Sequence, residues 1–286
     1  MMKSSSDQLK PKKRRVLLIF GLLLVIAILL FGILYCFFSS SIHKFFQSLS
    51  MKNATGGCYT IVDDFDEEDG LLGNFFDGGK DLQNLKNFVG ELEDHQSFIY
   101  LSIYENPLIV PFDSKFPKEV YSYGDDSVYN STLSIKAIEI NTNAANYYKL
   151  PLEEITLTSY EKGFQLPVLL GSEYAEVFEI GDNFLLDYFG LEFTATVRDI
   201  LDEGTTVERK KEEFCLDEYI VVPFIDCLSL PSTDQERTFQ AISYSCRANG
   251  DVILDDDYSF SSLQEELNRL TDKYSLPEMM YYRPFD

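Results

Sequence analysis

The chain has 286 residues, enough to bury one large core or two joined ones, and its formal net charge is −23. Residues 1–15 hold six of the 24 basic residues and one of the 47 acidic residues, so the remainder carries a net charge of −28. Such a surface repels nucleic acids and anionic lipid headgroups, and we therefore expect no nucleic-acid partner.

Residues 16–38 form an uninterrupted apolar segment with neither a charged residue nor a proline. As an α-helix this segment would extend about 35 Å, which is enough to cross a hydrocarbon core of about 30 Å. The basic run 10–15 precedes it, and the positive-inside rule assigns that end to the cytoplasm. The sequence thus predicts a single-pass protein of the cell membrane, with residues 1–15 as a cytoplasmic tail and an extracellular or periplasmic remainder. Cleavage after the apolar segment, near residues 39–41, is the alternative.

Beyond the span, apolar residues at helical spacing predict a stalk helix over residues 39–54. Residues 58–65 are predicted as a strand, and residues 81–94 as a helix with leucine, phenylalanine and valine on one face. Residues 97–104 are apolar throughout, which predicts a central strand. The three segments together predict a β-α-β unit with a right-handed crossover.

The next part of the chain is rich in proline, and residues 107–117 are expected to be a long irregular connection. Residues 133–140 are predicted as a strand from their alternation of apolar and polar side chains. Residues 167–170 are expected to form a short apolar strand. Residues 172–178 are expected to form one or two helical turns, which the side chain of Ser172 would cap.

A β-hairpin is predicted around Gly190, because residues 183–188 and 191–197 alternate with period two. Residues 218–224 are predicted as a further strand.

The last part of the chain is predicted to contain a second β-α-β unit. Residues 238–247 are interpreted as its first strand, followed by a turn at Asn249 and Gly250. Residues 259–274 carry a leucine stripe at helical spacing and are predicted as a helix. Residues 279–282 would form the closing strand.

The predicted fold class is therefore α+β, with one N-terminal transmembrane helix followed by an outer region. Residues 55–150 and 233–286 would contribute the two β-α-β units of a porter-like subdomain. Residues 151–232 would form a small β-rich subdomain inserted between these two parts.

Several short motifs follow one another in a recognisable order. They are residues 135–141, 145–150, 167–175, 180–182, 193–197, 200–201 and 216–224. This succession resembles the MacB-like periplasmic core domain, the outer domain of FtsX-like ABC-transporter permeases. In that family a PVVLG-S-x-x-A segment, a short helix, a GD turn and a hairpin follow one another in this order.

The resemblance implies an outer domain of two β-α-β units with a β-rich insertion, and a non-catalytic role. The family couples ATP hydrolysis inside the cell to a substrate or partner outside it. The implied partners are an ABC ATPase, a polytopic permease subunit, and a peptide or envelope protein. The sequence departs from the family because it stops at Asp286, where a second membrane helix would begin, and because it lacks the amphipathic helix before the first span.

No residue is predicted to be catalytic, to bind a cofactor or to bind a metal. Residues 78–81 lack the first glycine and the Ser/Thr of a phosphate loop. Residues 64–70 resemble a calcium loop, but Asp69 stands where glycine is needed and Phe75 where glutamate is needed. The acidic run 255–257 is interpreted as a solvated loop, and His43 and His95 have no partners that indicate catalysis.

Five cysteines leave the redox state open. Cys36 lies in the apolar segment, whereas the other four are predicted to lie outside the membrane, either as free thiols or in one or two disulfides. Those four are Cys58, Cys215, Cys227 and Cys246.

The predicted function is that of a non-catalytic, membrane-anchored outer domain of, or accessory to, a MacB/FtsX-like ABC transporter. The alternative is an independent single-pass surface module for binding or adhesion, with an acidic interaction face.

Overall fold

A computed structural model describes residues 57–63, 71–77, 79–113, 115–276 and 280–282. The predicted tail, membrane span and stalk, and the acidic loop 64–70, lie outside the described residues. Within the described residues, no helix is both long and apolar enough to cross a membrane.

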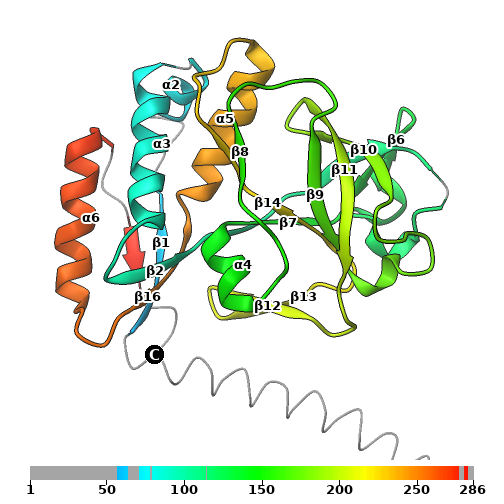
Figure 1. The fold of residues 1–286 in the computed structure, drawn as a ribbon. Helices are drawn as coiled ribbons and strands as arrows, with labels where there is room; N and C mark the ends of the chain where they lie inside the picture. Colours follow the sequence, from blue (N-terminus) through cyan, green and yellow to red (C-terminus); the bar gives the residue numbers. More distant parts are fainter. Residues whose placement is uncertain (1–56, 64–70, 78, 114, 277–279, 283–286) are drawn as a thin grey trace, which may run out of the picture. The chain divides into compact units, whose positions relative to one another are not determined.

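A four-stranded antiparallel sheet is built from strands at the two ends of the described region (Figure 1). Its order is β17-β1-β16-β2. The strands are β1 (Cys58–Val62), β2 (Phe98–Leu101), β16 (Gly250–Leu254) and β17 (Met280–Tyr282). Because neighbours are antiparallel, β1 runs parallel to β2, and β16 runs parallel to β17, each pair with one strand between.

Helix α3 (Lys80–Glu93) joins β1 to β2, and helix α6 (Phe260–Tyr274) joins β16 to β17. The sheet therefore contains two interleaved split β-α-β units. Both helices bury their leucine faces in the core with the sheet. A short helix, α2 (Leu71–Asp77), precedes α3 and was not predicted.

The second unit begins later in the chain than predicted. The predicted strand 238–247 is wrong, because this segment lies inside helix α5 (Asp234–Arg247). Thr233 caps α5 by accepting a hydrogen bond from the Glu236 N–H, and the second half of the helix is buried on most of its sides, which leaves no exposed face to mark a helix in the sequence. The predicted turn at Asn249 and Gly250 is wrong at Gly250, which starts the fully buried strand β16.

The predicted central strand 97–104 is divided between two sheets at Ser102. Its first half, β2, is an edge strand of the small sheet, and its second half is β3 (Ile103–Glu105) of the large sheet. Asn141 covers the free edge of β2: it accepts from the Ser102 N–H at 3.2 Å and donates to the Tyr100 carbonyl at 3.0 Å. The side chain thus replaces a neighbouring strand.

The large sheet of the described region has the order β3-β7-β14-β9-β11-β10-β4-β6-β5. Strands β3 and β4 (Leu108–Pro111) pair with β7 (Ala137–Ile140) and β6 (Thr132–Ile135) in one unbroken antiparallel register. The other strands are β5 (Val128–Tyr129), β9 (Gln165–Leu170), β10 (Asn183–Tyr188), β11 (Leu191–Ile200) and β14 (Ile220–Pro223).

This bent pair of segments closes the sheet into a barrel. At one end of the bend β7 pairs with β14, and at the other end β4 pairs with β10. Strands β9 and β11 complete the circuit between β14 and β10. Residues 107–117, predicted to be irregular, contain β4, and the predicted strand 133–140 is broken at Lys136.

Several local predictions are confirmed. The hairpin of β10 and β11 pairs Tyr188 with Leu191 across the turn, and the strands predicted at 167–170 and 218–224 are β9 and β14. The helical turn η3 (Ser172–Tyr174) is present, but Gly171 is its N-cap and Ser172 makes no capping hydrogen bond. The predicted role of Ser172 is therefore wrong.

Smaller elements surround the barrel. They are η1 (Lys118–Val120), η2 (Gly124–Ser127), α4 (Thr142–Tyr148), β8 (Ile155–Leu157), β12 (Thr206–Arg209), β13 (Glu212–Cys215) and β15 (Ile225–Cys227). Strands β8 and β15 pair in parallel, and β12 and β13 form a hairpin. The large sheet combines strands from 103–140 with strands from the expected insertion, 151–232; the predicted subdomain boundaries stay a prediction.

Aromatic side chains fill the two ends of the barrel. Phe239 of α5 packs against Tyr188 with ring centroids 5.1 Å apart, at the C-terminal end of β10. At the other end of β10, Phe184 packs with Phe178 and Phe116. The barrel is thus a packed core, as in other barrels of few strands.

Gly171 provides the first test of this packing. A Cβ atom there would overlap the backbone carbonyl oxygens of Leu216 and Asp217. We expect Gly171→Ala to lower the free energy of unfolding by at least about 2 kcal/mol, measured by urea denaturation of the full-length protein in detergent. Gly90→Ala is the control, because nothing lies within 4 Å of that position in α3, and alanine favours a helix by about 1 kcal/mol. Equal stability of the two variants would contradict the packing.

Candidate functional site

The polar side chains buried between the two sheets form the most unusual group in the described region. Arg247, at the end of α5, is 7% exposed and forms a bidentate ion pair with Glu93 at the end of α3. The Arg247 Nε donates to Glu93 Oε1 at 2.7 Å. Burial would lower the pKa of Arg247, but Glu93 raises it overall, so the guanidinium stays charged. This ion pair joins α5, whose Phe239 packs at one end of the barrel, to α3, which packs on the small sheet.

A second carboxylate extends the network towards the barrel. Asp226 of β15 lies 3.9 Å from Arg247 and accepts a 2.6 Å hydrogen bond from the Tyr244 hydroxyl. That hydroxyl also accepts from the backbone N–H of Cys227. A buried ion pair adds little net stability because both charges lose water, but loss of one partner leaves an unpaired buried charge and is costly.

Lys86 of α3 lies beside this network and is largely buried. Its ammonium group donates to the Ser229 carbonyl and to Gln240 Oε1, both at 3.1 Å. Burial lowers the pKa of Lys86, while Cys227 and Asp226 act against that shift. The nitrogen is thus engaged in holding the segment after β15 against α3.

Glu139 is a carboxylic acid inside the barrel. It is fully buried in β7, and its Oε1 accepts a 2.9 Å hydrogen bond from Asn106. Its Oε2 and the nearby Tyr188 hydroxyl make no hydrogen bond of good geometry. Burial raises the pKa of Glu139 to about 7, although Tyr188 and Asn106 act to lower it.

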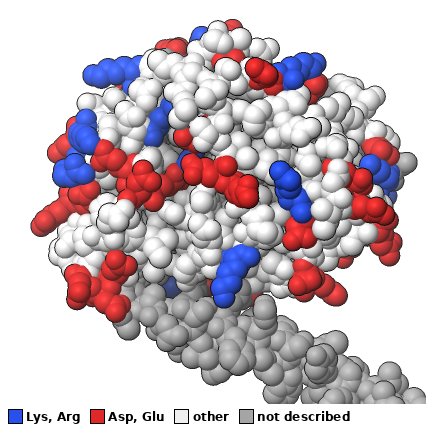
Figure 2. All heavy atoms as spheres, viewed as in Figure 1, with Lys and Arg blue, Asp and Glu red and all other residues white. Residues whose placement is uncertain are grey.

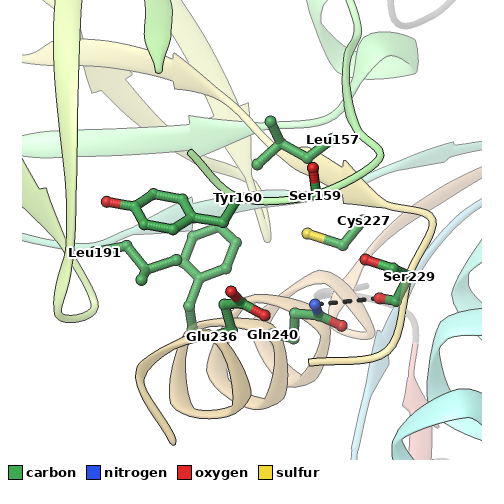
Figure 3. A pocket seen from close by; sticks show the side chains of 9 residues that line it. Leu157, Ser159, Tyr160, Leu191, Cys227, Ser229, Glu236 and Gln240 are labelled. Atoms are coloured by element: carbon green, nitrogen blue, oxygen red, sulfur yellow. Dashed lines mark hydrogen bonds between the residues drawn. The ribbon is translucent and has the colours of Figure 1, made fainter. Parts of the chain in front are cut away.

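One small cavity lies between β8, β15, β11 and α5 (Figure 3). The space available to the centre of a water molecule is about 10 Å³, so the cavity holds one water at most. Gln240 points into this region and donates to the Ser229 carbonyl at 3.3 Å. The lining residues are Leu157, Ser159, Tyr160, Leu191, Cys227, Ser229, Glu236, Phe239 and Gln240. A cavity of this size does not enclose a substrate.

The structure describes no disulfide bond among Cys58, Cys215, Cys227 and Cys246. Cys227 and Cys246 are buried, and burial raises the pKa of each thiol to about 12. Thiols in such surroundings are inert as nucleophiles. Cys215 is exposed on β13, and its thiol donates to Asp217 at 3.1 Å.

The residues considered in the sequence analysis lie apart from these groups. His95 stacks on Phe98 with ring centroids 3.9 Å apart, and Asp255, Asp256 and Asp257 are exposed. No cluster suited to a metal ion occurs within the described ranges. The loop 64–70, His43 and Cys36 lie outside these ranges.

Sequence reasoning missed Glu93, Arg247 and Glu139. Glu139 has a signal in the sequence: it shares the alternation of Ile135 and Ala137, whose side chains point into the core. Arg247 has none, because its segment was predicted as a strand, and its partner lies 154 positions away.

These features define a mixed α/β module with a packed interior and two joined sheets. No protein-family model matches the chain, and no curated protein matches it. The comparison with solved structures matches the chain to the periplasmic region of MacB from Actinobacillus actinomycetemcomitans, with a TM-score of 0.36 and 8% sequence identity. The alignment covers 80% of this chain and 91% of the MacB chain.

Glu139 generates a prediction about pH. Below its ordinary pKa of 4.5 the carboxyl is protonated in both the folded and the unfolded chain. Between 4.5 and about 7 the unfolded chain releases the proton first, so the free energy of unfolding falls with rising pH. At pH values above both pKa values, the free energy of unfolding is lower by about 3 kcal/mol than at pH values below both.

We expect Glu139→Gln to remove this loss, so that the variant is the more stable protein at pH 8 and gains little at pH 4. The measurement is urea denaturation of the full-length protein across this range. Glu153→Gln, at an exposed position, is the matched control and should follow the wild type. An unchanged pH profile in Glu139→Gln would contradict the assignment.

Proposed function

We propose that this chain is a non-catalytic, membrane-anchored outer module that is part of, or accessory to, an ABC exporter permease of the MacB/FtsX-like kind. The apolar segment 16–38 would anchor it, with residues 1–15 in the cytoplasm and the described region outside. The module would transmit a change in the permease to a substrate or an envelope partner.

The observation that carries this proposal is the course of the chain through the barrel. The sequence run that resembles the transporter domain occupies β9, η3, β10 and β11 in succession. Gly171 allows the close approach at the start of η3, and Gly181, with φ of +95°, makes the turn into β10. This order of strand, helical turn, glycine turn and hairpin is the order that the resemblance implies.

The topology also supports a module inserted between two anchors. Strands β1 and β17 are antiparallel neighbours, with Thr60 opposite Tyr282. The chain therefore enters and leaves the described region at one end of the small sheet. An outer domain that lies between two membrane helices needs this geometry.

The second candidate function is an independent surface module that binds a partner. It is favoured by apolar side chains that remain exposed on the barrel, which are treated below. Both functions require the barrel to lie outside the membrane, and they differ in whether a transporter subunit accompanies the chain.

The location of the barrel can be tested with Cys215, which is exposed on β13. We expect a membrane-impermeant maleimide to label it in intact cells that produce the full-length protein. Mildly alkaline pH is needed, because burial raises the pKa of this thiol and the thiolate is the reactive form. The control is Cys215→Ser, which should lose the label. Labelling of Cys215 only after the cells are broken would contradict an outer location.

The transporter role can be tested by extracting tagged full-length protein with several mild detergents and identifying what co-purifies. We expect an ABC ATPase or a polytopic permease subunit. A parallel preparation in which residues 57–286 are replaced by an unrelated domain should lose that partner. Recovery of the chain alone in every detergent would leave only the independent-module function.

A further inference from the structure

Exposed apolar side chains gather on one corner of the barrel. In the described region, the large apolar side chains with substantial exposure include Ile109, Leu185 and Tyr129, which are 37%, 45% and 72% exposed. They belong to β4, β10 and β5, which lie in the part of the sheet ordered β10-β4-β6-β5. Phe112, Tyr123 and Val128 lie in or next to the same strands and are also exposed.

The strand register aligns these residues across the outer face. Pro111 is opposite Thr132, which is opposite Tyr129. The pairing of Asp187 with Ile109 brings Leu185 level with Pro111 on the neighbouring strand. Leu185, Pro111, Thr132 and Tyr129 thus form one row across four strands, a width of about 14 Å. We call Ile109, Pro111, Tyr129 and Leu185 the outer strip.

The opposite side of the barrel lacks such exposure. The outward side chains of β7, β9 and β14 include Ile138, Leu169 and Val221, and all three are fully buried. The other elements of the described region therefore cover one side of the barrel and leave the outer strip open. Exposed apolar groups gathered in this way mark interaction sites more often than isolated ones do.

The charge around the outer strip restricts what can cover it. Residues 179–192, which include β10, contain four carboxylates and neither lysine nor arginine. Asp187 and Glu192 stand directly opposite each other on β10 and β11, although like charges in that position destabilise a strand pair. Lys162 lies 3.4 Å from Glu192, and Asp187 accepts a hydrogen bond from the Gly190 N–H.

The net charge of residues 16–286 opposes two occupants. A second copy would bring together two surfaces of net charge −28, and an anionic membrane would meet the same repulsion. Figure 2 shows acidic groups outnumbering basic groups on the face drawn there. A segment with apolar side chains and neighbouring lysine or arginine would cover the strip and neutralise Asp187.

We propose that the outer strip is a docking surface for a basic, apolar polypeptide segment of a partner protein. Apolar side chains of that segment cover Ile109, Leu185 and Tyr129, and its cations pair with Asp187 and the carboxylates beside it. This inference holds for either function proposed above, because it depends only on the face of the barrel.

The test uses the full-length protein in detergent and two labelled peptides of equal length, one alternating leucine with lysine and the other leucine with glutamate. Binding is measured by fluorescence anisotropy. The double variant Ile109→Ser and Leu185→Ser removes apolar surface from exposed positions, and Asp187→Asn removes the charge. The matched control is Leu228→Ser with Leu230→Ser, two leucines that are 62% and 48% exposed outside the strip.

We expect the lysine peptide to bind the wild type and the control equally, and to bind each strip variant at least about tenfold more weakly. The glutamate peptide should not bind. Equal binding to wild type and strip variants, binding of the glutamate peptide, or no binding of the lysine peptide would overturn the proposal. A wild-type dimer that the double variant abolishes would assign the strip to a second copy and overturn it as well.

Discussion

The arrangement of the two sheets depends on the side chain of Asn141. This amide is 2% exposed and lies at the end of β7. Its oxygen accepts from the Ser102 and Ala144 N–H groups, and its nitrogen donates to Glu93 Oε1 and the Tyr100 carbonyl. These four hydrogen bonds use the full capacity of an asparagine side chain. One residue thus caps α4, covers the free edge of β2 and contacts the buried ion pair.

The same point in the chain explains how one segment serves two sheets. After Tyr100 the backbone leaves the small sheet at Ser102 and enters the barrel as β3, without a loop between them. Asn141, at the end of β7, lies beside the point where the chain passes between the sheets. Its side chain donates a hydrogen bond to Glu93, which in turn pairs with Arg247 of α5. Removing any one of these partners would leave a buried polar group unsatisfied, which costs more than the contact itself contributes. The polar network therefore specifies how the sheets join, while the leucine and aromatic core supplies most of the stability.

Elements with local signals could be predicted from the sequence, and elements set by distant contacts could not. The hairpin of β10 and β11 combines period-two alternation with a glycine turn, so neighbours in sequence determine it. In the segment of α5 apolar and polar residues also alternate, as in a strand. Its N-terminal cap at Thr233 and its packing against α3 stabilise it as a helix instead. Closure of the barrel depends on the bend at Lys136 and on pairing of 103–111 with 132–140, which no local pattern reveals. The ion pair of Glu93 and Arg247 has the same origin, since it follows from the fold rather than from spacing.

The packed interior limits where this protein can meet other molecules. Aromatic rings fill both ends of the barrel, the cavity beside α5 holds one water at most, and the buried thiols are protonated. These interior groups therefore leave little room for a ligand between them. On the surface of the described region, the uncovered apolar side chains of the outer strip lie beside the opposed carboxylates of Asp187 and Glu192. Exposed apolar groups lower solubility, and opposed like charges destabilise a strand pair. A basic apolar segment would relieve both at once, because the contact that buries the strip also supplies the missing positive charge.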